Sequence, residues 1–377
     1  MSAPELAAVA IRAAIERAGI DAASIEEGIM GCVLPAGVKQ GPARQAMRQA
    51  GIPDANGATT INKLCGSGMK AAMLAHDLIK AGTGDILLAG GMESMSNVPF
   101  YARGLRDGVK LGNQTLEDGL IHDGLWCSFG DCHMGGHAEY TADRAGVTRS
   151  DADEFSLRSH QKAVEATREG RFRNEIVPVE VEGRRGVTVV DTDEGPRADS
   201  SLEALAKLRP VFKRDAPEGI DEHVVTAGNA SGRNDGAAAV VVASLEYAEA
   251  HGLEVDAFIS AYAVSATEPQ DLFFAPIAAV NNLMQKEGKE IGDYELVEVN
   301  EAFAVQAIAD MRALGMDEEL VNVNGGAVAL GHPIGASGTR ILVTLLNALE
   351  HRGEGTGLAT LCLGGGNAVA LSVERAI

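Results

Sequence analysis

Short apolar runs alternate with alanine-rich stretches of helical periodicity along most of this chain, and such alternation is typical of an α/β protein. Residues 58–64 and 85–91 are short and apolar or β-branched, which predicts strands. Residues 7–19 and 69–82 repeat apolar side chains at helical spacing and reach a glycine at their ends, which predicts helices. We therefore expect an α/β fold.

The middle of the chain interrupts this alternation. From about residue 95 to 233 the sequence is polar, glycine-rich and charge-rich, with one clear helix at 153–170. A buried strand at 236–244 restores the earlier pattern, which continues to the C-terminus. We expect a loop domain inserted into an N-terminal half and followed by a C-terminal half. The expected boundaries are 1–94 with 234–255 for the N-terminal half, 95–233 for the loop domain and 256–377 for the C-terminal half.

The two ends of the chain repeat one short pattern. TTINKLCGSG (59–68) and LATLCLGGG (358–366) both read as a strand, a cysteine and a glycine turn. A repeat this short is weak by itself. Together with the strand–helix alternation, it predicts two similar α/β halves whose strand ends meet.

Composition excludes several functional classes. The formal net charge of −21 argues against binding a nucleic-acid backbone or an anionic membrane surface. No apolar run approaches the roughly 18 residues that a membrane span needs, and the first residues do not resemble a secretory signal. Five scattered cysteines indicate reduced thiols, hence a cytoplasmic protein. An anionic ligand would depend on a few local Arg or Lys residues and on helix N-termini.

Cys65 stands between the predicted strand 58–64 and the predicted helix 69–82. A free cysteine is often simply a buried residue, and that interpretation stays open. A thiol at a helix N-terminus, however, lies at the positive end of the helix dipole, which predicts a lowered pKa and a reactive thiolate. Gly66 and Gly68 predict a close approach of substrate to the backbone, whose N–H groups could bind an oxyanion.

Three other residues could work with this thiol. His332 precedes a proline in a glycine-rich loop, 324–338, and is either a surface residue or the histidine base that a cysteine nucleophile needs. Cys362 ends the strand of LATLCLGGG and is either a core residue or a second reactive thiol. Asn300 ends the predicted strand ELVEVN, where its amide either caps the next helix or holds a water or substrate oxygen.

A cluster of cysteines and histidines raises the question of a zinc site. Cys127, Cys132, His133 and His137 lie within the eleven residues CSFGDCHMGGH. The spacing lacks the separation between ligand pairs that zinc fingers have, and no second pair follows. We therefore expect no metal.

Six motifs, in order, together resemble the thiolase family over essentially the whole chain: NKLCGSGMKA, GGMESMSNVP, TAGNASGRNDGAAA, NEAF, GGAVALGHPIGASG and CLGGGNAVAL. The resemblance implies a five-layered αβαβα sandwich of two similar halves, with the loop domain over the active site. It also implies a homotetramer built from tight dimers.

The resemblance assigns roles residue by residue. Cys65 resembles the nucleophile that takes an acyl group from a CoA thioester, and His332 the base that activates it. His332 and a water held by Asn300 would form one oxyanion hole, and the backbone N–H groups of Cys65 and Gly364 the other. Cys362 resembles the acid/base that removes the α-proton of the second acetyl-CoA. Further residues are similar to positions that line the CoA and pantetheine tunnel: Leu125, His133, Met134, Arg197, Ala227, Gly228 and Ser231.

The activity implied by the resemblance is the reversible Claisen condensation of two acetyl-CoA into acetoacetyl-CoA and CoA, with no cofactor besides the CoA thioester. His133-Met134 favours two-carbon substrates, whereas residues 265–276 depart from the biosynthetic pattern. A 3-ketoacyl-CoA thiolase of broader chain length, as in fatty acid β-oxidation, is therefore the alternative. A ketosynthase-type enzyme fits less well, because Asn300 stands where that class has a histidine and Cys362 is present. A catalytically silent thiolase-like binding protein is disfavoured by the four intact catalytic side chains.

The start of the chain departs from the family pattern. Thiolase-like chains begin with a strand of the type VVIVxAxRTPxG, whereas this chain opens with residues that resemble the following helix. We expect that strand in the middle of the first sheet, so that its loss would leave two facing rows of backbone groups unpaired. On this basis we expect Met1 to be a misassigned start, and the 377 residues alone to be poorly soluble or inactive.

Overall fold

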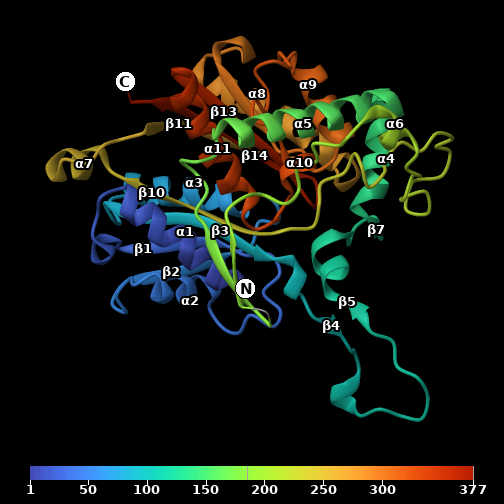
Figure 1. The fold of residues 1–377 in the computed structure, drawn as a ribbon, viewed down its shortest axis with the longest axis horizontal. Coiled ribbons are helices and arrows are strands. Elements are labelled where there is room, and N and C mark those ends of the chain that lie inside the picture. The colour runs from blue at the N-terminus through green and yellow to red at the C-terminus, as the bar shows by residue number, and fades with distance from the viewer. Residues whose placement is uncertain (185, 377) are drawn as a thin grey trace.

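Two four-stranded sheets form the centre of the molecule, one in each half of the chain (Figure 1). The computed structural model describes residues 1–184 and 186–376. The first sheet has the strand order β2-β1-β3-β10, in which β1 pairs in parallel with β2 and β3, and β10 runs antiparallel to β3. Its strands are β1 (Glu27–Gly31), β2 (Gly57–Ile61), β3 (Ile86–Ser94) and β10 (Asp235–Ala243).

The second sheet repeats part of this order. Its strands run β12-β13-β14-β11, with β12 and β13 parallel and the other two pairs antiparallel. An isolated bridge joins Val297 to Val321 on the outer side of β12. The strands are β11 (Ala257–Ala266), β12 (Leu296–Val299), β13 (Thr356–Leu363) and β14 (Asn367–Arg375).

Helices cover both faces of each sheet. The helices α3 and α11 pack against each other between the two sheets, while α1 and α2 cover the outer face of the first sheet and α8 that of the second. The apolar core accordingly lies between the sheets and beneath each outer helix pair. The helices are α1 (Ala3–Arg17), α2 (Pro42–Gln49), α3 (Ser67–Lys80), α8 (Ala275–Glu287), α9 (Ala304–Leu314) and α11 (Ser337–Arg352).

Close contact between α3 and α11 explains two glycines of the sequence motifs. A Cβ at Gly68 would lie 2.5 Å from Thr339 Oγ1 and 2.7 Å from the Thr339 amide nitrogen. A Cβ at Gly338 would overlap the backbone of Met69. These glycines therefore let the N-termini of the two central helices meet. Gly68 serves helix packing, and the expectation that it opens the backbone to substrate is wrong.

The first sheet is continuous, which corrects the expected position of the absent strand. β1 pairs directly with β3 from Glu27 to Gly31, so the described residues leave no gap in the middle of the sheet. Comparison of the halves matches β1, β3 and β10 with β12, β13 and β14. The strand β11, which pairs with β14, has no counterpart beside β10 among the described strands. A corresponding strand would thus lie at the edge beyond β10, where its absence leaves one unpaired row instead of two.

The segment 95–233 adds no strand to either four-stranded sheet among the residues described. Its two long helices are α4 (Met134–Ala145) and α5 (Arg149–Glu169), and α5 begins at a capping box formed by Thr148 and Asp151. An arm around residues 100–118 projects from the body of the molecule (Figure 1). Its shorter elements are β4 (Phe100–Tyr101), β5 (Glu117–Asp118), β6 (Trp126–Cys127), β7 (Cys132–His133), β8 (Val179–Gly183), β9 (Gly186–Val190) and α6 (Leu202–Ala206).

Two short helices complete the chain, α7 (Leu245–His251) between the halves and α10 (Ala327–Leu330) in the glycine-rich loop. No described helix combines the length and the apolar character needed to cross a membrane.

Candidate active site

A strained turn presents Cys65 between β2 and α3. Leu64, directly before the cysteine, has a φ of 49°, in the left-handed region that side chains other than glycine rarely adopt. Ser67 holds this turn, because its Oγ donates to Leu64 O at 2.6 Å and accepts from Lys63 N–H at 2.8 Å. Backbone strain kept in place by such contacts is common at functional sites. Gly66 packs against Leu363, because a Cβ there would lie 2.7 Å from Leu363 Cδ2.

The thiol of Cys65 is not ionised by its helix. Burial raises its pKa to about 11, although the amide N–H groups of Gly364 and of Cys65 itself oppose the rise. The expectation of a lowered pKa is therefore wrong, because loss of hydration outweighs the dipole of α3. Cys65 is a thiol at neutral pH and needs a base to become a nucleophile.

His332 supplies a neutral imidazole whose Nε2 carries a free lone pair and can accept a proton. Its Nδ1 lies 2.6 Å from Ser337 Oγ, whose own hydrogen goes to Pro333 O at 3.0 Å. Since the serine hydroxyl has one hydrogen, Nδ1–H must be the donor to Ser337, and Nε2 carries the free lone pair. Burial and the nearby Arg340 lower the pKa of His332 to about 3. His332 Nε2 is buried and has no hydrogen-bond partner among the described residues.

Cys362 and Gly364 come from β13 and the turn after it. Cys362 is 2% exposed, and burial, with the adjacent Cys65 and Asp310, raises its pKa well above the ordinary range. The Gly364 amide reaches the sulfur of Cys65, so that residues from the two halves share one site. A Cβ on Gly364 would lie 3.0 Å from Leu64 Cδ1, which ties the turn after β13 to the residue before the nucleophile.

Asn300 adds an unpaired amide to this site. It follows β12, is fully buried, and both atoms of its carboxamide lack a partner among the described residues. An unpaired buried polar group costs about 1–3 kcal/mol, so a side chain in this state indicates a partner from outside the protein. The amide therefore does not cap α9, and the alternative of a water or substrate oxygen is favoured.

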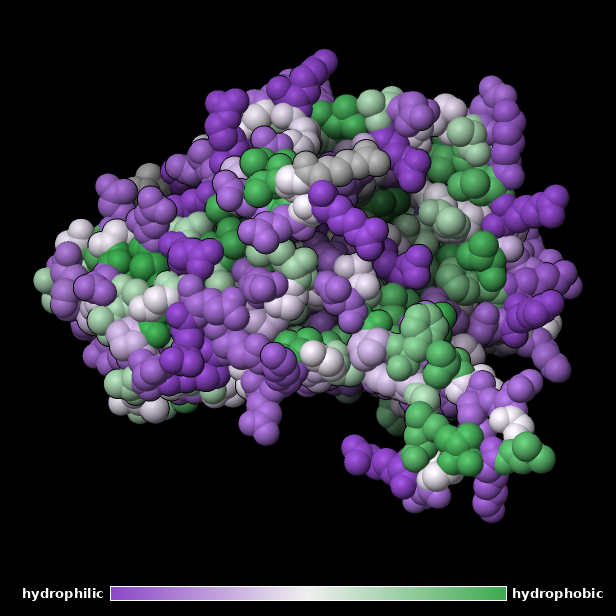
Figure 2. Space-filling model, turned by 60° about the horizontal axis from the view of Figure 1, so that its bottom comes forward, coloured by the Kyte–Doolittle hydropathy of each residue, from purple (hydrophilic) through white to green (hydrophobic). Residues whose placement is uncertain are grey.

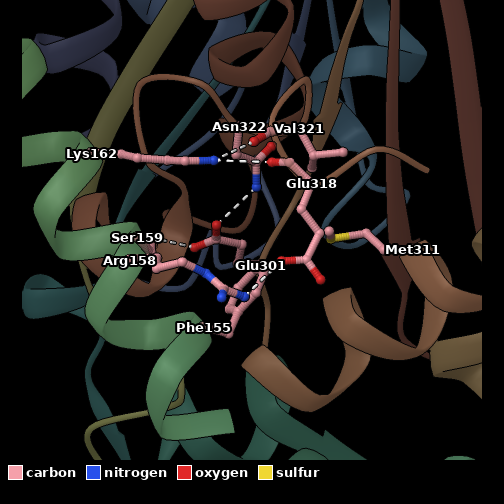
Figure 3. A pocket seen from close by; sticks show the side chains of 9 residues that line it. All are labelled: Phe155, Arg158, Ser159, Lys162, Glu301, Met311, Glu318, Val321 and Asn322. Carbon is pink, nitrogen blue, oxygen red and sulfur yellow. Dashed lines mark hydrogen bonds and ion pairs between the residues drawn. The ribbon is translucent and has the colours of Figure 1, made fainter. Parts of the chain in front are cut away.

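The neighbouring Glu301 fixes the backbone at Asn300. Its carboxylate, 1% exposed, accepts hydrogen bonds from Ser159 Oγ and Asn322 Nδ2, both at 2.8 Å (Figure 3). It also accepts from Val328 N–H at 2.9 Å. These partners come from α5, from the loop before α10 and from α10 itself. The cavity beside them measures about 20 Å³ and is too small for a substrate.

Two of the expected tunnel residues contact residues of this site. Leu125 packs against the same small apolar cluster as Cys65, and the terminal methyl of Met134 lies 3.9 Å from the Cβ position of Gly364. His133 caps α4, where its Nδ1 accepts from Gly135 N–H, and it stacks on Phe212 with 4.6 Å between ring centroids.

The loop 226–231 contacts the chain just after Asn300. The amide of Ser231 donates to Ala302 O at 3.1 Å, two residues beyond Asn300. Gly228 packs against Leu205 and Leu208, and Ala227 is exposed. Arg197 is exposed, and its backbone N–H donates to His160 Nδ1 of α5 at 3.2 Å.

Comparisons with known proteins agree with this geometry. The family model "Thiolase, N-terminal domain" matches residues 1–246, and "Thiolase, C-terminal domain" matches residues 253–375. The chain belongs to the thiolase family. It is 48% identical to the acetyl-CoA acetyltransferase of Pseudomonas aeruginosa over 374 residues, which cover 99% of this chain and 93% of the relative.

Other relatives of this thiolase have similar names. The acetyl-CoA acetyltransferase of Paracoccus denitrificans is 47% identical over 375 residues, covering 100% of this chain and 94% of that protein. The crystal structure of the Bacillus anthracis acetyl-CoA acetyltransferase matches with a TM-score of 0.95 at 38% identity, covering 100% of this chain and 93% of that one. The expected family and the expected α/β fold are therefore confirmed.

Sequence reasoning missed two residues of this thiolase site. Ser337, which orients His332, lies five residues after it in GHPIGAS, and a buried serine following a histidine–proline pair is the available signal. Leu64 gives no signal, because nothing in a leucine predicts a positive φ.

Proposed function

We propose that this thiolase is an acetyl-CoA C-acetyltransferase that condenses two acetyl-CoA into acetoacetyl-CoA and CoA through acetyl-Cys65. The observation that carries the proposal is the pair of neighbouring thiols, the half-buried Cys65 and the buried Cys362. The buried and unpartnered Nε2 of His332 and amide of Asn300, on the other two motif loops, support it. The names of the full-length relatives support the same activity.

In the first half-reaction, His332 Nε2 takes the proton of the Cys65 thiol, and the sulfur attacks the thioester carbonyl of acetyl-CoA. The N–H groups of Cys65 and Gly364 stabilise the negative oxygen of the tetrahedral intermediate. The carbon–sulfur bond to CoA then breaks, and the departing CoA thiolate takes the proton from His332. Because both nucleophile and leaving group are thiolates, this step is readily reversible.

In the second half-reaction, His332 Nε2 takes the proton of the Cys362 thiol, and the resulting thiolate removes the α-proton of a second acetyl-CoA. The enolate oxygen lies against His332 and a water held by Asn300, and the carbanion attacks the carbonyl of acetyl-Cys65. The bond between Cys65 sulfur and the acetyl group breaks, which releases acetoacetyl-CoA, and the Cys65 thiolate takes the proton held by His332, so that both cysteines are thiols again. A separate base is required because an acetylated Cys65 cannot also remove a proton.

CoA would lie along the loops that carry the expected tunnel residues. An open cavity of about 940 Å³ borders this region, and one of its lining residues, Phe129, packs against Gly365 in the turn after β13. We assign CoA contacts to Leu125, His133, Met134, Arg197, Ala227, Gly228 and Ser231. The thioester is substrate, and the proposed reaction uses no further cofactor.

Initial rates of thiolysis with acetoacetyl-CoA and with 3-ketoacyl-CoA substrates of six or more carbons test the proposed substrate. The proposal expects the four-carbon substrate to have the higher kcat/KM. Comparable rates on longer substrates would instead favour the broader 3-ketoacyl-CoA thiolase, and no turnover of any thioester would indicate a silent binding protein.

Further parts of the proposal concern assembly. The two sheets and their covering helices correspond to a five-layered αβαβα sandwich, with residues 95–233 as the loop domain between an N-terminal and a C-terminal half. The projecting arm exposes apolar side chains (Figure 2), namely Phe100, Leu105, Val109, Leu111 and Leu116. A surface of this kind favours an interface between copies, and we propose a homotetramer. The five free cysteines support a reducing, cytoplasmic location.

A further inference from the structure

Glu93, near the end of β3, is a buried carboxylate that the chemistry above does not use. It is fully buried, and both of its oxygens accept hydrogen bonds. Oε2 accepts from Val33 N–H at 3.0 Å and Gly335 N–H at 2.9 Å, and Oε1 from Leu34 N–H at 3.0 Å. The thiol of Cys32 lies 3.7 Å from Oε1 as a fourth donor. A buried carboxylate is costly unless its oxygens are satisfied, and these are.

The donors come from both halves of the molecule. Val33 and Leu34 follow β1 in the first half, whereas Gly335 lies between His332 and α11 in the second. The other described backbone hydrogen bonds of residues 333–336 are local: Pro333 O accepts from Ala336 and Ser337 N–H, and Ala336 O accepts from Thr339 and Arg340 N–H. Glu93 thus joins the turn that carries His332 to the half that carries Cys65.

The fit around this turn leaves little freedom to shift. A Cβ at Gly335 would lie 2.6 Å from Met92 O and 2.7 Å from Glu93 Oε2, and the carbonyl of Gly335 occupies the space that a Cβ at Gly91 would need. Because the packing is this close, we expect the turn to keep its position only while the Glu93 carboxylate binds it.

We propose that Glu93 is a positioning residue for acetyl transfer, which holds the His332 turn of one half against the Cys65 site of the other. This inference rests on the proposed function. It goes beyond it by assigning the alignment of base and nucleophile to a residue that touches neither substrate nor the reacting atoms. Misplacement of a catalytic group by about 1 Å can cost about a hundredfold in rate, so loss of this contact affects acetyl transfer more than CoA binding.

The test measures acetyl transfer to Cys65 in a single turnover, together with steady-state kcat and KM for acetyl-CoA. It is done at pH 8, because burial raises the pKa of Glu93 to about 7 and the side chain must be charged. In Glu93→Gln, an amide group of similar size replaces one acceptor oxygen. We expect acetyl transfer to fall by about tenfold to a hundredfold, with KM changed less than about threefold.

An exposed carboxylate just before β1 of the same sheet provides the control. Glu26 also accepts two backbone N–H groups, from Asp85 at 2.6 Å and Ile86 at 3.4 Å, at the opposite end of β3. Glu26→Gln should leave kcat and KM within about twofold of the wild type, because this contact is remote from the site.

A rate for Glu93→Gln within twofold of the wild type, or a rise in KM alone, would overturn the positioning role. If Glu93→Gln does not fold, the same measurements are made on Gly335→Ala. The added methyl would clash with Glu93 Oε2 and break the hydrogen bond from Gly335 N–H to that oxygen. An unchanged transfer rate in that variant would also overturn the role. Failure of the wild type to acetylate Cys65 would contradict the proposed function itself, and the positioning role with it.

Discussion

Replacement of Ser337 by alanine tests the assignment of His332 as the base. Ser337 Oγ accepts a hydrogen bond from His332 Nδ1–H at 2.6 Å and donates one to Pro333 O. Without it, Nδ1–H is buried and unsatisfied, which costs about 1–3 kcal/mol. The imidazole avoids this unsatisfied donor by changing tautomer, so that its hydrogen lies on Nε2. Nε2 is the atom that must accept the proton of Cys65. The base form therefore becomes scarcer by between about fivefold and a hundredfold.

A rapid-quench measurement of acetyl transfer from acetyl-CoA should show this loss. Since burial holds the pKa of His332 near 3, the ring is neutral at every pH well above that value. The loss should accordingly be the same at pH 7 and pH 9, because no protonation of the ring intervenes.

Ser156→Ala is the matched control for this prediction. Ser156 is also fully buried in a helix and donates to the carbonyl four residues earlier, Ala152 O at 2.7 Å, but no histidine is among its described hydrogen-bond partners. Its variant should transfer acetyl at the wild-type rate. An equal loss in both serine variants, or a change below twofold in Ser337→Ala, would refute the tautomer assigned to His332.

Three other substitutions separate the remaining roles. Cys362→Ser should still release one equivalent of CoA and trap acetyl on Cys65, while condensation falls by orders of magnitude; normal turnover would remove Cys362 from the mechanism. Arg197→Ala should raise KM for CoA substrates more than it lowers kcat, since a contact remote from the thioester acts alike in ground and transition states; a loss of kcat alone would contradict this contact. Asn300→Leu should lower condensation by about 10²–10³ without lowering the thermal unfolding temperature, because it removes an unpaired buried amide; a large drop in unfolding temperature would show a structural role.

Local patterns in the sequence predicted most secondary structure correctly. The expected helices 69–82 and 153–170 correspond to α3 and α5, and the expected strands 85–91 and 236–244 correspond to β3 and β10. These segments combine strong periodicity with clear ends, such as the glycine after α5 at position 170.

The relation between the halves was predicted for the wrong reason. The repeated strand–cysteine–glycine pattern predicted two similar halves, but its two cysteines do not stand at equivalent places: Cys65 follows the edge strand β2, whereas Cys362 lies in the inner strand β13. In the second sheet, Val321 pairs with the outer side of β12, the place that β2 occupies beside β1 in the first sheet. Cys65, which follows β2, therefore corresponds to the region after Val321. There Asn322 has a φ of 45°, close to that of Leu64. Strand order depends on contacts between distant segments, which a short motif does not specify.

The electrostatics of the site also could not be predicted from sequence. Position at a helix N-terminus predicted an acidic thiol at Cys65, but burial by residues of both halves reverses the shift. The same limit applies to Ser337 and Glu93, whose partners lie in a turn or in the other half of the chain. Residue type and spacing identified the reacting groups, whereas the groups that orient them depend on tertiary packing.

Mass spectrometry of the protein after brief mixing with acetyl-CoA tests the central claim most directly. The account predicts one added acetyl group, located on the peptide that contains Cys65, lost on addition of CoA and absent from a Cys65→Ala variant. Acetylation of a different residue, or none under conditions in which the wild type forms acetoacetyl-CoA, would contradict a mechanism through acetyl-Cys65.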